Sequence, residues 1–159
     1  MYLAEKFKIV PVLSDIAMGS TPTTCDSINM KNYHRATFLI SIGNTMAGAN
    51  YTMTAHSGKT DAALTSTLYF KYAFAGTAGL GVTADVLAAD AYVNTLAIAH
   101  GTYDSWMLVV EVDAADMDMA NQEEWLTLSF ADAGTTGDLS IFAILEPRYT
   151  GALSATALA

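Results

Sequence analysis

The fold of this chain is decided by the stretch Tyr103–Val112 (YDSWMLVVEV), the acidic segment Asp113–Asn121 (DAADMDMAN) and the stretch Glu124–Phe130 (EWLTLSF). The two outer stretches are rich in β-branched and aromatic residues, which favour strands. In the first stretch apolar and mixed positions alternate with a period of two, as in a strand that buries one face. The positions expected to face the core are Trp106, Leu108, Val110, Val112 and, in the second stretch, Phe130.

Similar strand signals lie on both sides of this unit. Strands are expected at residues 27–30, 35–42, 51–56, 67–74, 94–100 and 139–146, whereas residues 82–91 are ambiguous between a strand and a helical turn. Gly101 and Thr102 suit a hairpin turn between the strands at 94–100 and 103–112. About seven to nine short strands, separated by turns every 8 to 12 residues or so, predict one all-β domain built as a sandwich or a barrel.

The two ends of the chain have a different character. In residues 1–26, two prolines and the loop-like run 19–24 predict an extended N-terminal arm outside the domain at 27–149. This arm carries more apolar surface than a free tail should, so it is expected to be ordered only against a partner surface. The expected contact residues are Phe7, Ile9, Val10, Val12, Leu13 and Ile16. The small-residue tail at 150–159 is expected to be disordered or held by a neighbour.

Composition limits the classes of function. Only 14% of the 159 residues are charged and 52% are hydrophobic, against about 25% charged in an ordinary soluble domain. Such a surface favours a chain that packs against neighbours, so a homo-oligomer is expected. The net charge of −9 would repel a phosphate backbone, which disfavours direct nucleic-acid binding. No apolar run is long enough to span a membrane and no secretory signal is evident, so synthesis in a cytoplasm is expected.

The acidic segment invites comparison with a calcium loop, because Asp113, Asp116 and Asp118 lie close together. An EF-hand counted from Asp113 would need oxygen ligands at Ala115 and Met117 and a glycine at position 118, so that motif fails. A looser cage of oxygen ligands for a hard cation stays open. The alternative is a capped turn with solvated carboxylates, which is the preferred interpretation.

Other sequence motifs for chemistry also fail. Ser57–Thr60 (SGKT) ends like a phosphate-binding loop, but Met53 stands where the leading glycine is required. The glycines between 76 and 81 do not follow the dinucleotide fingerprint, and the lone Cys25 has no catalytic signature. The three histidines, His34, His56 and His100, show no zinc-ligand spacing. We therefore expect no enzyme, with no catalytic residue, metal or cofactor.

A surface for glycans is a further alternative, because the strands carry many aromatic residues. Rings at strand spacing are more often core than binding platform, and an exposed cluster of Trp or Tyr would decide between the two. The residues concerned are Tyr69, Phe70, Tyr72, Phe74, Trp106 and Trp125.

Three segments, at 27–40, 110–118 and 141–149, together resemble small head structural proteins of bacteriophages and prophages. The first (SINMKNYHRATFLI) resembles their opening strand, the second (VEVDAADMD) their central strand and acidic elbow, and the third (IFAILEPRY) their closing strand. The resemblance frames residues 27–149 and leaves out the lead-in and residues 75–91.

This resemblance implies a β-sandwich, jelly-roll-like or Greek-key, on the capsid exterior of a virion. It implies a decoration or cement protein, most often a homotrimer, whose partner is the major capsid protein. No catalytic residue is carried over, because none defines the group. The alternative is a head-fibre or tail-associated β-sandwich that recognises host surface glycans.

Overall fold

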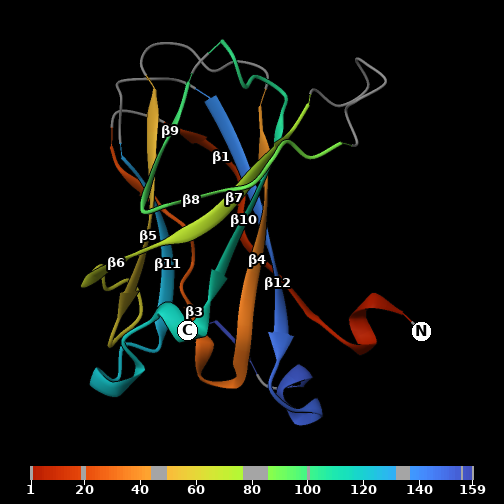
Figure 1. Cartoon of the computed structure of the whole chain (residues 1–159), viewed down its shortest axis with the longest axis vertical. Helices are drawn as coiled ribbons and strands as arrows, with labels where there is room; N and C mark the ends of the chain where they lie inside the picture. Colours follow the sequence, from red (N-terminus) through yellow and green to blue (C-terminus); the bar gives the residue numbers. More distant parts are fainter. Residues whose placement is uncertain are drawn as a thin grey trace.

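The computed structural model describes residues 2–18, 21–43, 50–76, 86–99, 101–131, 137–154 and 156–158. Two antiparallel sheets face each other around one core (Figure 1). Sheet A has the strand order β1 (Lys8–Met18), β12 (Gly137–Pro147), β4 (Tyr33–Ile42), β10 (Met107–Asp113), β7 (Phe70–Ala75) and β8 (Ala91–Val93). Sheet B has the order β2 (Thr23–Thr24), β11 (Trp125–Ala131), β5 (Tyr51–Gly58) and β6 (Ser66–Leu68), with β3 (Ile28–Asn29) also on β11 and β9 (Thr95–Ile98) also on β5.

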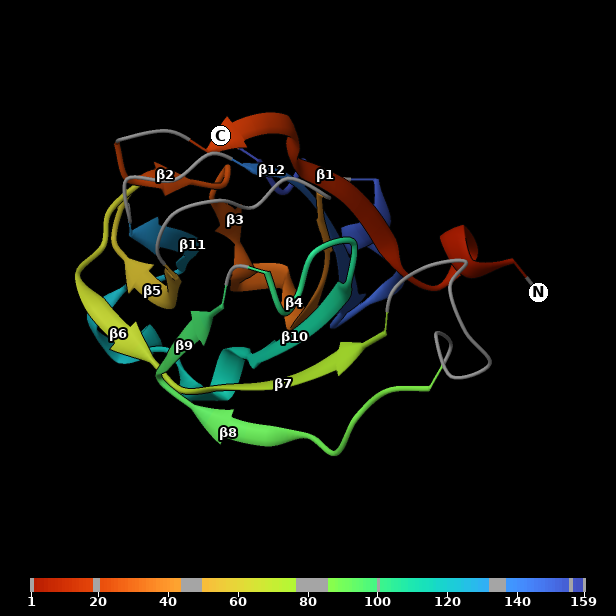
Figure 2. The ribbon, with the colours of Figure 1, turned by 90° about the horizontal axis from the view of Figure 1, so that it is seen from above.

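The pairing of strands that are distant in the sequence makes this sandwich a jelly roll. The last strand, β12, lies between β1 and β4, and β11 lies between β2 and β5. Seen from above, the two sheets curve around the core (Figure 2). Nested antiparallel pairs of this kind form the two Greek keys of a jelly roll. The expected all-β sandwich is confirmed.

Short 3₁₀ turns complete the described residues: η1 (Leu3–Glu5), η2 (Met30–Asn32), η3 (Ala114–Asp116), η4 (Met119–Asn121) and η5 (Thr150–Leu153). Within these residues, none of the helical segments has the length and apolar character needed to cross a bilayer.

The alternation in β10 was predicted correctly. Leu108, Val110 and Val112 are fully buried, and Phe130 of β11 is buried opposite them in the core. Trp106 precedes β10 and is half-buried, with its ring edge-on to Phe74 at 6.2 Å between centroids.

The expected N-terminal arm is wrong, because most of it belongs to the sandwich. β1 pairs antiparallel with β12 from Lys8, opposite Leu145, to Met18, opposite Gly137, with two register shifts. Pro11 is tolerated because it lies on an edge strand, where one side of the backbone has no ladder partner, and Pro22 lies between β1 and β2. The pairing joins opposite ends of the chain, so no local sequence pattern reveals it.

Two further expectations about strand connections are wrong. Gly101–Thr102 is not a hairpin turn, since β9 pairs with β5 in sheet B whereas β10 pairs with β4 and β7 in sheet A. The expected strand at 67–74 is interrupted at Tyr69, so that β6 joins sheet B and β7 joins sheet A. In both cases the chain crosses between sheets, and at Tyr69 it does so while its period-two alternation continues.

The C-terminal segment packs on its own domain. Ala152 and Ala157 are buried. The carbonyl of Ala152 accepts a hydrogen bond from the Tyr33 hydroxyl at 2.9 Å, and the carbonyl of Ala157 accepts one from the Asn29 amide at 2.8 Å. These bonds tie the segment to the turn η2 and the start of β4.

Candidate functional site

The outer face of sheet A is hollowed into a trough that crosses several strands. Its middle is a hollow of about 460 Å³, flanked by hollows of about 320 and 250 Å³. Glu111 lines all three, Lys71 lines the first and second, and Arg35 lines the first and third, so the hollows adjoin one another. The middle hollow, here called the trough centre, is lined by Arg35, Lys71, Tyr92, Glu111, Asp113, Ala115 and Asp116.

Strand register brings these side chains together. One row of residues in register crosses β4, β10, β7 and β8. It consists of Thr37, Glu111, Lys71 and Tyr92, in that order. All four point outward because the residues that flank Glu111 in β10 point into the core. Four strands from separate parts of the chain therefore build one row.

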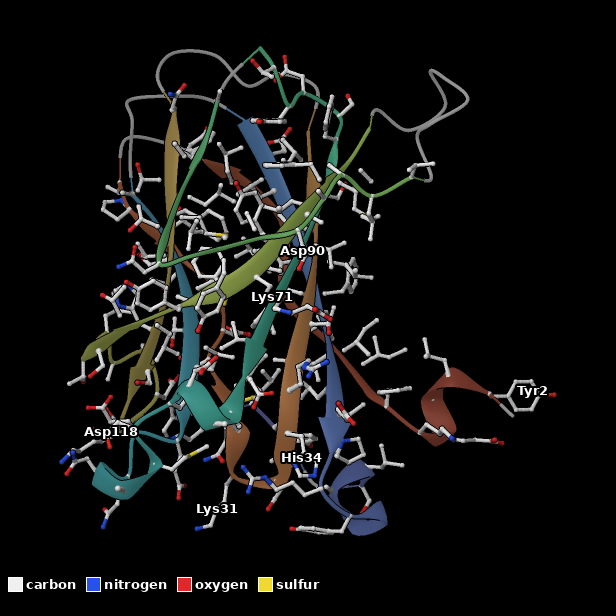
Figure 3. The ribbon with its side chains drawn as sticks, in the orientation of Figure 1. Tyr2, Lys31, His34, Lys71, Asp90 and Asp118 are labelled. Atoms are coloured by element: carbon white, nitrogen blue, oxygen red, sulfur yellow. The ribbon has the colours of Figure 1, made fainter. Side chains whose placement is uncertain are left out.

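The trough centre holds both hydrogen-bond donors and acceptors. The Arg35 Nη2 atom lies 3.6 Å from Asp113 Oδ2. The Lys71 Nζ atom lies 3.9 Å from Asp90 Oδ2, and Figure 3 labels these two residues. The Thr37 hydroxyl donates to Glu111 at 3.4 Å. Both ion pairs are exposed to solvent, so each contributes about 0–1 kcal/mol to stability. For ligand binding, the two ion pairs matter because each places a cationic side chain next to a carboxylate on the same surface.

An exposed pair of tyrosines borders the trough centre. The rings of Tyr69 and Tyr92 stack at 5.3 Å with an interplanar angle of 24°, although the two residues are 51% and 54% exposed. The Tyr92 hydroxyl donates to Asp116 at 3.5 Å. Desolvation and the Asp116 carboxylate raise the pKa of Tyr92, so its hydroxyl keeps its proton.

Next to the trough, the same face of sheet A is apolar. In register across five strands lie Pro11, Phe142, Leu39, Val109 and Ala73. Phe142 and the neighbouring Met107 are exposed.

The outer face of sheet B contrasts with this mixed surface because no strand of the sheet contains Asp, Glu, Lys or Arg. Its outward positions are mainly hydroxyl side chains. One row crosses β2, β11, β5 and β9 in register and consists of Thr24, Ser129, Thr54 and Thr95. A second row consists of Thr127, His56 and Thr67. Thr127 is fully buried, with its hydroxyl 2.6 Å from the Ser27 hydroxyl, so only His56 and Thr67 of this row reach the surface. We call this surface the hydroxyl face.

His56 is the one titratable group in these two rows. Its Nε2 lies 2.8 Å from the Thr54 hydroxyl. Burial lowers the pKa of His56, which favours the neutral imidazole near neutral pH. The two rows therefore carry no charge near neutral pH, in a chain whose net charge is −9.

The structure does not gather the expected contact residues on one surface. Val10, Val12 and Leu13 are buried in the core of their own chain, so they are not available to a partner. Ile9 is exposed, and Phe7 lines the 250 Å³ hollow at one end of the trough. Ile16 lies in β1 opposite Leu139.

The acidic elbow is a pair of capped turns. The Asp113 carboxylate accepts the Ala115 amide at 2.9 Å and caps η3, while Asp118 accepts the amide of Asn121 at 3.2 Å and caps η4. In the ranges given above, no three Asp, Glu, His or Cys side chains form a group that could hold a metal ion.

The remaining motifs resolve into structural roles. Ser57 is buried and donates to the buried Glu123 at 2.7 Å, and a Cβ on Gly58 would lie 2.5 Å from Ala63. Cys25 is buried, and burial raises its pKa to about 12. His34 lies in sheet A and His56 in sheet B, while His100 falls outside the described residues.

The aromatic residues divide between core and surface. Phe70 and Phe74 are buried, and Tyr72, Trp106 and Trp125 are half-buried. Of the residues considered from sequence, Tyr69 alone is exposed. Its partner Tyr92 was missed, because it follows the ambiguous stretch at 82–91, and no pattern indicated that it would lie beside β7.

Comparison with protein-family models and with curated proteins finds no match. Among solved structures, the chain is similar to one from work titled "Bacillus endospore appendages form a novel family of disulfide-linked pili". That match has 13% sequence identity and a TM-score of 0.45 over 89% of this chain and 90% of the other. A likeness of this degree supports no inference about function.

Proposed function

We propose that this chain is a non-enzymatic structural protein of a phage virion, a capsid decoration or cement protein that binds across neighbouring subunits of the major capsid protein. The observation that carries the proposal is the hydroxyl face, whose strands contain no Asp, Glu, Lys or Arg although the chain is strongly acidic. The resemblance of residues 27–149 to phage head proteins supplies the virion context.

Physical chemistry supports this face as the contact with the shell. Interface centres are depleted in charged residues, because burying an unpaired charge costs more than the contact returns. A standard interface covers about 800 Å² of each partner, which is roughly a tenth of the 8022 Å² surface of this chain. A contact that forms only on the assembled shell stabilises that shell by mass action.

Electron microscopy of purified particles tests the virion assignment. We expect density for the sandwich on the outside of the capsid, with sheet B toward the shell. Particles that lack the chain would contradict the proposal.

Paired substitutions test the hydroxyl face. Thr95 is exposed in β9, so both Thr95→Asp and Thr95→Lys should leave the protein folded. Each should lower occupancy on shells about tenfold, because either charge must be desolvated on binding. The matched control is Ser41, an exposed hydroxyl on the outer face of sheet A, where Ser41→Asp and Ser41→Lys should have little effect.

The direction in which Thr95→Asp and Thr95→Lys change occupancy distinguishes an uncharged contact from an electrostatic one. If Thr95→Lys strengthens binding while Thr95→Asp weakens it, the contact is an electrostatic one, and the uncharged interface is wrong. If neither substitution changes occupancy, the shell contact lies elsewhere.

A further inference from the structure

We infer that the trough centre on sheet A binds neutral saccharides, with Tyr92 as the stacking platform. This inference does not rest on the proposed function, since the trough and the hydroxyl face lie on opposite sides of the sandwich. Its starting point is the exposed Tyr69–Tyr92 stack at the border of a 460 Å³ hollow.

The size and lining of the hollow match a small-molecule site. Such sites occupy about 300–1,000 Å³ and combine an apolar or aromatic wall with a few placed polar groups. Here the aromatic wall is Tyr92, held in place from behind by Tyr69 and at its hydroxyl by Asp116. An aromatic ring fixed in this way offers an apolar face to the C–H groups of a pyranose ring.

The polar groups favour a ligand that both donates and accepts hydrogen bonds. Arg35 and Lys71 supply only donors, whereas Glu111 and Asp113 as carboxylates supply only acceptors. A sugar hydroxyl can donate to a carboxylate and accept from a cation at the same time. The alternating charges along the trough therefore suit adjacent hydroxyl groups.

Charged ligands fit less well. A sulfated or phosphorylated ligand would face Glu111, Asp113 and Asp116, on a chain with net charge −9. The net charge attracts a lysine-rich peptide, but its ammonium groups would approach Arg35 and Lys71, which lie on either side of the β10 carboxylates. A neutral ligand avoids both penalties.

The test uses the full chain and an array of short neutral oligosaccharides built from glucose, galactose, mannose or N-acetylglucosamine. A heparin-derived oligosaccharide and an oligolysine peptide serve as competing probes. We expect binding to at least one neutral oligosaccharide, measured in solution by calorimetry, and weaker binding of both charged probes. A reducing-end assay on the same mixture should find no cleavage.

Variants locate the site. Tyr92→Ala should weaken binding about tenfold, and Tyr92→Phe, which keeps the ring, should stay within about threefold of the parent chain. Glu111→Gln, a second variant, should also weaken binding, because it replaces a carboxylate acceptor with an amide of similar volume. The matched control is Tyr2→Ala, because Tyr2 is exposed near the N-terminal turn η1, away from Lys71 and Asp90 (Figure 3).

Several results would overturn the inference. These are no binding to any neutral oligosaccharide, preferential binding of either charged probe, or binding that survives both Tyr92→Ala and Glu111→Gln. Cleavage of the oligosaccharide would also overturn it, since the site would then be catalytic. Thr95→Asp should leave saccharide binding intact, so failure of this inference is distinguishable from failure of the proposed capsid contact.

Discussion

At the scale of single residues, neighbouring side chains in β10 contribute very differently to the free energy of unfolding. Leu108 is fully buried whereas Met107 is 40% exposed. We expect Leu108→Ala to lower the free energy of unfolding by about 2–5 kcal/mol, because it removes transfer energy and leaves a cavity. Met107→Ala should change it by about 0.5 kcal/mol or less. Denaturant titration measures both, and equal midpoints for the two variants would contradict the alternation.

His56 gives a residue-scale prediction about pH. Because burial lowers the pKa of His56 below its usual 6.5, the unfolded chain takes up the proton first as pH falls. The stability that this histidine contributes is therefore present above about pH 6.5 and is lost as pH falls through the lower, folded-state pKa. His56→Gln should show a smaller drop in melting temperature between about pH 7 and pH 5 than the parent chain.

Comparing the parent chain with His56→Gln removes the contribution of the acidic residues to the pH dependence of the melting temperature, because both proteins contain the same acidic residues. The difference in melting temperature between the parent chain and His56→Gln should be constant above about pH 7.5, because His56 is then neutral in both the folded and the unfolded state of the parent chain. Parallel melting curves down to pH 5 would show that His56 is not the group responsible.

At the scale of elements, β1 decides whether the N-terminal segment belongs to the fold. It lies at the edge of sheet A on β12, and Val10, Val12 and Leu13 join the core while Ile9 and Pro11 are exposed. Removing residues 1–20 should therefore unfold or aggregate the protein, since it would uncover β12 and part of the core. If residues 1–20 were instead an arm outside the fold, their removal would leave the protein folded.

A matched pair of substitutions tests β1 more finely. Val12 is 2% exposed and Ile9 is 47% exposed. Val12→Asp should cost more than about 3 kcal/mol, because it buries an unpaired carboxylate, while Ile9→Asp should cost less than about 1 kcal/mol. Denaturant titration separates them. Two equally mild effects would mean that β1 does not pack as described.

At the scale of the whole molecule, low charge density favours association although the net charge opposes it. We expect a homo-oligomer, with the trimer number taken from the resemblance to phage head proteins. Light scattering should give about three times 16.8 kDa. Copies of net charge −9 repel one another, so association should weaken at low ionic strength and strengthen as salt screens the charge. A stable monomer across this range of salt would contradict the expectation.

The sequence alone determined which residues of the strong strands face inward. Alternation with a period of two is a local property, and burial of one face of a strand imposes it directly, as at Leu108, Val110 and Val112. Composition likewise indicated an uncharged surface, although it did not say which surface. The all-β sandwich followed from the number and spacing of such strands.

Only the tertiary structure decided which strands are neighbours. Alternation continues unchanged where the chain passes from one sheet to the other, as it does at Tyr69, so it says nothing about partners. The pairing of β1 with β12 and the row that joins Glu111 to Lys71 and Tyr92 depend on contacts between distant segments. Both candidate surfaces are products of that register, because each is assembled from several strands and exists on none of them alone.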